Sequence, residues 1–296
     1  MKELIFTGSA VAMITPMCDD GSVNFAELKK MAEFQVESGT DALVVCGTTG
    51  ESATLEDDEH LECIRCVVEA VQGRVPVIAG TGSNNTAHAV MMSKEAAALG
   101  ADALLLVTPY YNKTSQAGLI AHYTAIAQAV DLPCILYNVP SRTGCNLLPA
   151  TCAALARHPR IAAVKEASGN ISQIVELAAL AGDALTLYSG NDDQIVPLLA
   201  MGGSGCISVL SNVVPRQAQT LCDRFFAGDT AGAAELQCRL LPLTQALFCE
   251  VNPIPVKAAL AAMGYGSGAV RLPLTPMEES RRAVLLEEMK KLGVLA

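Results

Sequence analysis

The stretch Ile161-Ala-Ala-Val-Lys165-Glu-Ala-Ser-Gly169 decides how this sequence is interpreted, because four apolar residues lead directly into a lysine and then into a small polar turn. A continuous apolar run closed by a turn is typical of a buried strand in a parallel sheet. The lysine therefore stands where the strand leaves the core. Two interpretations are open at this point. Lys165 is either a strand-end lysine whose ammonium reaches water, or an amine in a partly desolvated pocket, where its pKa falls and it can form a Schiff base.

Seven further apolar runs alternate with segments of helical period. Together with the first run they give eight expected strands, at 8–15, 42–46, 75–79, 103–107, 134–137, 161–165, 185–189 and 205–209. The helices expected around them, most with polar or acidic starts, lie at 24–37, 55–72, 85–99, 115–130, 147–156, 171–181, 193–201 and 215–227. Repeated βα units with strands that are apolar on both faces predict a parallel α/β fold. Eight units of similar length, without a glycine fingerprint after the first strand, favour a (β/α)8 TIM barrel over an open doubly wound sheet.

After Gly228 the strand pattern stops. Three helices are expected in this part of the chain, at 229–250, 255–263 and 276–292. We therefore predict two units, a catalytic barrel over residues 1–228 and a C-terminal helical domain over residues 229–296. The expected role of the second unit is to cover the flank of the barrel or to contact another subunit.

The composition narrows the class of partner. The net charge is −10 with 20 basic residues, and because phosphate backbones and anionic membranes bind basic surfaces, neither nucleic acid nor a membrane is expected. Apolar residues make up 51% of the sequence, enough for a large core, yet no apolar run reaches the roughly 18 residues of a membrane helix. The apolar region after Met1 is too short for a signal peptide, so the cytoplasm is the expected compartment.

The 11 cysteines raise disulfides and metal sites as alternatives. Disulfide frameworks are typical of short secreted chains. The spacing of His60, Cys63 and Cys66 resembles half of a zinc site, but these residues fall on an expected amphipathic helix and no second pair follows at a suitable distance. We interpret the cysteines as small buried apolar residues and expect no metal or other cofactor.

In a parallel barrel the active site lies at the carboxyl ends of the strands. The polar residues that follow the expected strands are Gly47-Thr48-Thr49-Gly50-Glu51, Gly80-Thr81-Gly82, Thr108-Pro109-Tyr110-Tyr111-Asn112, Tyr137 with Asn138 to Gly144, Lys165, Ser189-Gly190-Asn191-Asp192, and Ile207-Ser208. Histidine and paired carboxylates of the metal-ligand type are missing from this set. A metal-dependent mechanism and a Ser-His-Asp triad are therefore disfavoured.

The remaining groups suit amine catalysis. Schiff-base formation requires a nucleophilic nitrogen, a proton shuttle and a site for a carboxylate. Tyr137 ends the strand beside that of Lys165, and its phenol can move protons if other hydroxyls complete a chain. The amides of Thr48–Gly50 can hold a carboxylate, and Arg142 can bind a second one in bidentate fashion. Each motif alone has an ordinary explanation, as a turn, a packing tyrosine or a solvated loop charge. Their joint placement at successive strand ends favours chemistry.

The chain resembles the dihydrodipicolinate synthase (4-hydroxy-tetrahydrodipicolinate synthase) family, within the pyruvate-dependent class I aldolase superfamily. The resemblance covers nearly the whole chain and rests on five motifs in family order, namely Gly47-Thr-Thr-Gly-Glu51, Thr108-Pro-Tyr-Tyr-Asn-Lys113, Tyr137-Asn-Val-Pro-Ser-Arg-Thr-Gly144, Val164-Lys-Glu-Ala167 and Asn252-Pro-Ile-Pro-Val-Lys257. The first motif and the lysine motif occur throughout the superfamily. The third and fifth are more specific to the synthases.

The resemblance implies a lyase that condenses pyruvate with L-aspartate 4-semialdehyde, on the route to diaminopimelate and lysine. By it, Lys165 would carry the pyruvate imine and Tyr137 would donate and accept protons. Thr48 and Tyr111 would complete a proton relay, with Tyr111 reaching across from a neighbouring subunit. The assembly implied is a homotetramer built as a dimer of dimers.

The same resemblance implies the substrate contacts. Thr49 and Ile207 would contact pyruvate through their backbones, and Gly190 is expected beside the substrate. Arg142 would receive the carboxylate of the aldehyde.

A regulatory site is also implied, because many members of the family are inhibited by lysine at the tight dimer interface. The matching positions here are Ser52, Ala53, His60, Asn84, His88 and Tyr110. Feedback-sensitive members carry glutamate where this chain has His88, and often histidine where it has Asp57. A glutamate pairs with the ammonium of the inhibitor, whereas an imidazole does not, so we predict weak or absent inhibition by L-lysine.

Two other functions stay open on the sequence. The nearest is a lyase of the same superfamily that acts on N-acetylneuraminate or a 2-keto-3-deoxy sugar acid, which would share Lys165 and Tyr137 but not the carboxylate site at Arg142. The other is a non-catalytic barrel that binds a small ligand.

Overall fold

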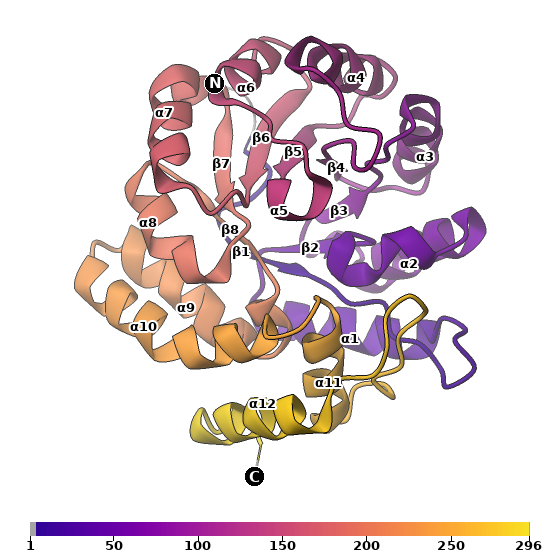
Figure 1. Ribbon diagram of the computed structural model, residues 1–296, viewed down its shortest axis with the longest axis vertical. Helices are drawn as coiled ribbons and strands as arrows, with labels where there is room; N and C mark the ends of the chain where they lie inside the picture. Colours follow the sequence, from indigo (N-terminus) through magenta and orange to yellow (C-terminus); the bar gives the residue numbers. More distant parts are fainter. Residues whose placement is uncertain (1–3, 296) are drawn as a thin grey trace.

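The computed structural model describes residues 4–295. Its centre is a closed barrel of eight parallel strands in chain order, in which the last strand pairs again with the first (Figure 1). The strands are β1 (Gly8–Ala12), β2 (Ala42–Val45), β3 (Val77–Gly80), β4 (Ala103–Val107), β5 (Cys134–Asn138), β6 (Ile161–Glu166), β7 (Thr186–Ser189) and β8 (Gly205–Ser208). The (β/α)8 barrel expected from the alternating pattern is therefore confirmed.

The continuous apolar strands produce a barrel because each strand is covered on both faces. Residues of β3 show the two layers. Ile78 packs inside the barrel with Ala10 and Ala163, whereas Val77 and Ala79 belong to the larger core between the strands and the helices. All of these residues are buried, so the barrel interior is a packed core and its open mouth is the place left for polar side chains.

The outside of the barrel is covered by α1 (Phe25–Glu37), α2 (Asp57–Val71), α3 (Thr86–Ala98), α4 (Gln116–Gln128), α6 (Pro149–Leu155), α7 (Ile171–Ala181), α8 (Ile195–Ala200) and α9 (Pro215–Phe226) (Figure 1). Several helices begin where the sequence places a polar residue. The side chains of Asn24, Asn85, Ser115 and Asn170 each accept a hydrogen bond from a backbone N–H in the first turn, which satisfies donors that the helix itself leaves free.

Each expected strand and helix has a counterpart, with ends that shift by a few residues. The main difference is the segment after β5, which the sequence presents as a loop and which contains a short helix, α5 (Pro140–Thr143). Pro140 fixes the first helical φ and Gly144 ends the helix with φ of 66°, a conformation that glycine adopts freely. Short 3₁₀ turns also follow three strands, as η1 (Thr48–Gly50), η4 (Asp192–Gln194) and η5 (Leu210–Asn212).

Beyond Gly228 the chain is helical, as expected, with α10 (Thr230–Leu247), α11 (Ile254–Ala262) and α12 (Glu279–Lys291). Helix α10 packs against α9 and α12, and α11 packs against α12 and η5. These helices lie along one side of the barrel (Figure 1). The division into two domains at residue 228 stays a prediction. Among residues 4–295, no helix is long and apolar enough to span a bilayer.

Candidate active site

Lys165 and Tyr137 lie side by side at the carboxyl ends of β6 and β5. Their Cα atoms are register partners, and both side chains are buried. The Nζ atom of Lys165 lies 4.5 Å from the centroid of the Tyr137 ring. Tyr188 on β7 is the register partner of Lys165 on the other side. The amine of Lys165 therefore lies over the ring of Tyr137, on a strand whose two neighbours each place a tyrosine in register with it.

The amine of Lys165 sits in an environment that disfavours its charge. Burial lowers the pKa of Lys165 to about 8, an effect that Asp192 partly offsets and that the positive charge of Arg142 reinforces. Within residues 4–295 no carboxylate forms an ion pair with Lys165. Because this pKa lies near neutrality, Lys165 is a neutral amine in a fraction of the protein molecules. The neutral amine is the nucleophilic form.

Asp192 is the acidic group that faces this amine. It is buried, and its Oδ2 atom accepts hydrogen bonds from the backbone N–H groups of Val209 (3.0 Å) and Leu210 (2.9 Å). Burial raises the pKa of Asp192, while the hydroxyl of Ser208, these two amides and Lys165 oppose that rise. Sequence reasoning placed Asp192 at the end of the seventh expected strand and gave it no role.

Gly190 stands directly against the stem of Lys165. A Cβ atom at this position would lie 2.7 Å from Cβ of Ala167 and 3.0 Å from Cε of Lys165. Any side chain here would have to displace the lysine. The expectation that Gly190 borders the substrate came from the family resemblance and stays a prediction; the structure shows the glycine directly against Lys165.

The turn after β2 brings two threonines to the barrel mouth. Burial raises the pKa of the Tyr137 phenol, whereas Arg142 and a hydrogen bond with the side chain of Thr48 lower it. Thr49 is buried and its Oγ1 atom accepts a hydrogen bond of 3.0 Å from Nδ2 of Asn252. Thr48 is thus joined to the phenol, and Thr49 is joined to the C-terminal part of the chain.

Glu51, at the end of the same turn, is held by two further C-terminal residues. Its carboxylate forms an ion pair with Lys257, and each side chain is only 1% exposed. The other carboxylate oxygen, Oε2, accepts the backbone N–H of Arg271 at 3.1 Å. Sequence reasoning missed these contacts. Its only signal was the Asn252–Lys257 motif, which carried a resemblance but no stated role.

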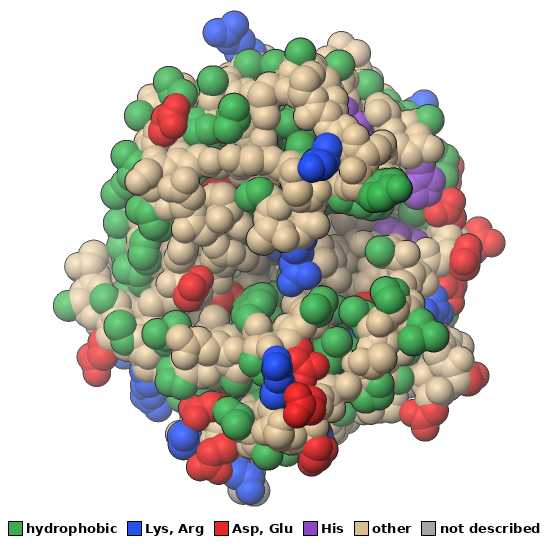
Figure 2. Space-filling model, viewed as in Figure 1, with side chains coloured by type: hydrophobic (Ala, Val, Ile, Leu, Met, Phe, Trp, Pro, Cys, Tyr) green, Lys and Arg blue, Asp and Glu red, His purple; other side chains and the backbone are tan. Residues whose placement is uncertain are grey.

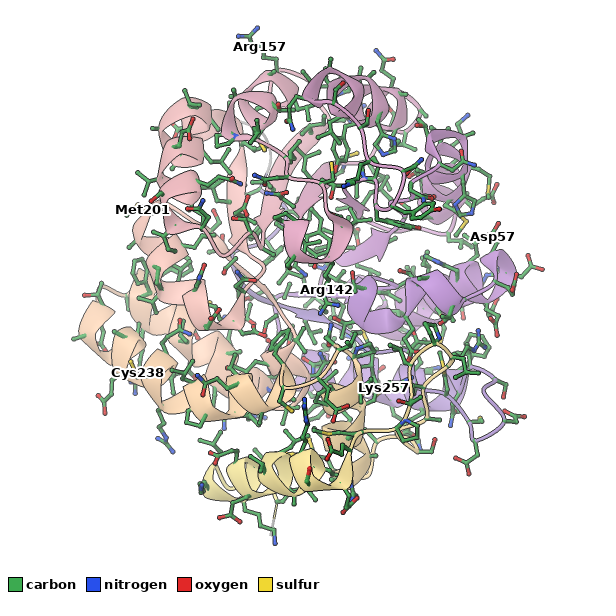
Figure 3. The ribbon with its side chains drawn as sticks, viewed as in Figure 1. Asp57, Arg142, Arg157, Met201, Cys238 and Lys257 are labelled. Atoms are coloured by element: carbon green, nitrogen blue, oxygen red, sulfur yellow. The ribbon has the colours of Figure 1, made fainter. Side chains whose placement is uncertain are left out.

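Arg142 lies on α5, in front of the barrel opening (Figure 3). It is exposed and borders a cavity of about 470 Å³ together with Thr48 and Asn252. Figure 2 shows a hollow at the centre of this face with basic side chains at its rim. Ile207 is buried on β8, in register with Ala10. The fold therefore gathers Lys165, Tyr137 and Thr48 closely, with Arg142 at the entrance.

Tyr111 is the expected site residue that the single chain does not bring to the lysine. Its side chain is 90% exposed, and its φ of 66° is in the left-handed region that a bulky residue seldom adopts. The neighbouring Tyr110 is 37% exposed and does border the cavity. A strained backbone at an exposed aromatic residue makes Tyr111 a candidate for a functional contact beyond this single chain.

Five of the six positions expected to bind lysine border the same cavity, namely Ser52, Ala53, His60, His88 and Tyr110. Asn84 instead donates to the backbone oxygen of Tyr110 at 3.2 Å. Nε2 of His88 lies 2.9 Å from Oδ1 of Asp57. This chain thus has the acid at position 57 and the imidazole at position 88, the reverse of the pattern expected in feedback-sensitive members. The carboxylate of Asp57 is already paired with His88.

Taken together, these groups can form and break a covalent bond to a carbonyl compound. Lys165 supplies the nucleophile, and Tyr137 and Thr48 supply a hydrogen-bonded route for a proton. Arg142 supplies fixed positive charge for an anion. Among residues 4–295 no cluster of three or more His, Cys, Asp or Glu side chains has the arrangement of a metal site.

Comparison with known proteins adds the family. Residues 5–292 match the Dihydrodipicolinate synthetase family. A 4-hydroxy-tetrahydrodipicolinate synthase of Lachnoclostridium phytofermentans is 54% identical over 292 residues, which cover 98% of this chain and 99% of that protein.

Solved structures agree with this match. The dihydrodipicolinate synthase of Thermotoga maritima superimposes with a TM-score of 0.97 at 42% identity, covering 99% of this chain and 100% of that one. The chloride-inhibited dihydrodipicolinate synthase of Acinetobacter baumannii complexed with pyruvate gives a TM-score of 0.96 at 44% identity, with the same coverage.

Proposed function

The chain belongs to the dihydrodipicolinate synthetase family, and from this membership we infer its reaction. It condenses pyruvate with L-aspartate 4-semialdehyde to give 4-hydroxy-tetrahydrodipicolinate, in the biosynthesis of lysine and diaminopimelate. The structural observation that supports this reaction is Lys165, which is buried beside Tyr137 and whose pKa is lowered to about 8. Neither the sugar-acid lyases nor a non-catalytic barrel is favoured by the relatives.

The proposed chemistry begins at Lys165. Its neutral Nζ attacks the keto carbon of pyruvate, and loss of water leaves a protonated imine. Tyr137 passes a proton to the departing hydroxyl and then accepts one from the methyl group, which gives an enamine. The enamine carbon adds to the aldehyde carbon of the second substrate, the protonated imine re-forms, and the aldehyde oxygen takes the proton that Tyr137 had accepted from the methyl group. Attack of that substrate's amino group on the imine carbon then closes the ring and releases Lys165. The protonated imine is itself the electron sink, so this sequence needs no metal.

The roles of the surrounding residues are part of the proposal. Thr48 relays protons to Tyr137, and Tyr111 of a neighbouring subunit completes the relay. Thr49 and Ile207 hold pyruvate through their backbones, with Gly190 giving room beside Lys165. Arg142 receives the carboxylate of the aldehyde substrate. The high exposure of Tyr111 and the short approach at Gly190 support these assignments.

We propose a homotetramer that works in the cytoplasm, where pyruvate is a central metabolite. Two features support the assembly. Tyr111 is exposed on one face, and apolar side chains are exposed elsewhere on α7, at Ile171, Val175 and Leu180, and just after α8, at Met201. Sedimentation velocity tests this assembly. A protein that stays monomeric at micromolar concentration while fully active would contradict both the tetramer and the shared Tyr111.

The experiment that tests the function is reductive trapping. The protein is incubated with pyruvate and borohydride, and peptide mass analysis locates the adduct. Modification of Lys165 is expected; an unmodified Lys165 refutes the proposal. A coupled assay then compares aspartate semialdehyde with N-acetylneuraminate, and the former is expected to be turned over.

A further inference from the structure

The turn that is proposed to hold pyruvate is itself held by one C-terminal segment. Asn252 donates to Oγ1 of Thr49, and Lys257 pairs with Glu51. These contacts join residues that are 203 and 206 positions apart in the chain. The segment between them is the start of α11, where Asn252 and Lys257 are both buried. Contacts this distant in sequence and this well buried indicate a specific task for the segment.

The direction of the first hydrogen bond matters for ligand binding. Nδ2 of Asn252 is the donor, so Oγ1 of Thr49 is the acceptor, while Oδ1 of the same amide is buried without a partner among the described residues. A hydroxyl that accepts one bond still has its proton to give, and no described residue receives that proton. Thr49 is buried at the barrel mouth with one donor unused. A carboxylate is the kind of group that such a donor, together with backbone amides, binds best.

The second contact fixes the backbone of the turn. Glu51 has φ of 54° and ψ of 35°, the left-handed region that residues with a side chain seldom adopt. Its carboxylate is held on one side by Lys257 and on the other by the backbone N–H of Arg271. An ion pair in which both side chains are 1% exposed is anchored by the cost of leaving either charge unpaired.

We propose that Asn252 and Lys257 are positioning residues for the 2-oxo acid. They hold the Thr48–Glu51 turn so that the hydroxyl proton of Thr49 and the backbone amides of the turn converge on the carboxylate of pyruvate. The inference rests on the proposed function and extends it, because it makes the C-terminal segment part of the pyruvate site. Neither residue touches the reacting atoms. Asn252 acts through Thr49, and Lys257 acts through Glu51.

A double-mutant cycle tests the role of Asn252, using Thr49→Val, Asn252→Ala and the combined variant. The readout is the pyruvate concentration that gives half-maximal borohydride trapping at Lys165. Loss of one hydrogen bond to a charged group corresponds to a roughly tenfold rise in that concentration. Thr49→Val and Asn252→Ala are each expected to raise it by about this factor. The combined variant is expected to be no worse than Thr49→Val alone, because the two changes remove one interaction.

The KM for the aldehyde separates positioning from general damage. It is expected to stay within about twofold in Asn252→Ala, since Arg142 is untouched. Multiplied effects in the combined variant, or an unchanged half-trapping concentration in Asn252→Ala, would overturn the inference for Asn252. Failure of the proposed function would show in the parent protein, which would then form no adduct with pyruvate. Failure of the positioning role alone would show only in the Asn252 variants.

Lys257 needs its own variant, because a single change leaves a buried charge alone. Glu51→Gln combined with Lys257→Met removes both charges and keeps similar volumes. We expect a folded protein whose half-trapping concentration for pyruvate rises at least about tenfold. Glu59→Gln is the matched control. Glu59 pairs with Arg271 at 2.6 Å and so joins the same two parts of the chain, but it does not touch the turn. Equal pyruvate responses in the double variant and the control would overturn the role of Lys257.

Discussion

Two of the lysines among residues 4–295 are buried, and they have opposite environments. Lys165 is the penultimate residue of β6, lies 4.5 Å from the ring centroid of Tyr137 and has no ion-pair partner among the described residues. Lys257 lies on α11 and is paired with the carboxylate of Glu51. Burial lowers the pKa of both, and for Lys257 the carboxylate opposes that effect. Their exposed fractions are nearly the same, at 5% and 1%. What separates them is the partner.

The difference shows how one side chain serves two purposes. An ammonium that keeps a carboxylate beside it remains charged and ties two segments together. Burying an ammonium without such a partner raises the free energy of the folded protein. Loss of the proton removes the charge and reduces that free-energy cost. The second arrangement yields a nucleophile. Burial alone therefore does not identify the reactive lysine; burial together with the lack of a bonded carboxylate does.

The largest expected effect is the loss of the unpaired amine. Lys165→Ala should lower kcat/KM by at least about 10³-fold, because no other group in the site can form the imine. The coupled assay with aspartate semialdehyde measures this loss, and borohydride trapping should give no adduct. Lys291→Ala, on the exposed end of α12, is the control and should behave as the parent. Turnover of Lys165→Ala at the parental rate would show that the covalent mechanism is wrong.

The paired lysine should affect stability instead. Lys257→Met leaves Glu51 buried without its counter-charge and is expected to cost about 3–5 kcal/mol in the free energy of unfolding. Glu51→Gln in the same chain should recover most of that loss, because the uncompensated charge is then removed. Urea denaturation followed by circular dichroism gives both values. A single variant as stable as the parent would mean that the ion pair is not the anchor.

The sequence predicted the part of this comparison that depends on local pattern. Apolar runs such as Ile161–Val164 place a strand, and a lysine at the end of such a strand in a closed barrel must lie at its mouth. The neighbouring strand end at Tyr137 follows from the chain order. Short-range signals were therefore sufficient for the barrel and for the proximity of lysine and phenol.

The other features of the site could not be predicted from the sequence, because they depend on contacts between residues far apart in the chain. Nothing near Lys257 in the sequence indicates that it meets Glu51, since the two are 206 residues apart. Asp192 and Asp193 are adjacent, and only the fold decides that the first turns inward to the amides of Val209 and Leu210. The left-handed backbone of Tyr111 is likewise a tertiary effect, since local preference opposes it.

The charge of Asp192 should set the pH dependence of imine formation. Lys165 attacks as the neutral amine, so kcat/KM for pyruvate should rise with pH and level off above the pKa of about 8. Asp192 favours the ammonium, so its removal lowers the pKa of Lys165. Asp192→Asn should therefore move the half-maximal point to lower pH. It should also reduce the adduct yield at saturating pyruvate, because the protonated imine loses the stabilising charge of Asp192.

Trapping rates measured between pH 6 and 10.5 test both parts of this prediction (the range spans the usual lysine pKa of about 10.4). Asp193→Asn is the matched control, since Asp193 is the adjacent acid and lacks the hydrogen bonds that Asp192 accepts from the backbone of Val209 and Leu210. An unshifted profile in Asp192→Asn would show that Asp192 serves the backbone of Val209 and Leu210 alone. A parental midpoint near 10 would show that Lys165 resembles an ordinary surface lysine.

The smallest expected effect concerns a third ammonium, that of free L-lysine. Lys257 illustrates that an ammonium in a closed site is stable beside a carboxylate. In the cavity, position 88 is histidine, and the nearby carboxylate of Asp57 is engaged by its Nε2 at 2.9 Å. We therefore expect little or no inhibition by sub-millimolar lysine in a dose-response assay. Exchanging the pair, as Asp57→His with His88→Glu, places the acid at position 88 of the cavity and should increase the response. Strong inhibition of the parent would mean that Asp57 gives up His88 to the ligand, and that a partnered carboxylate is still available to an ammonium.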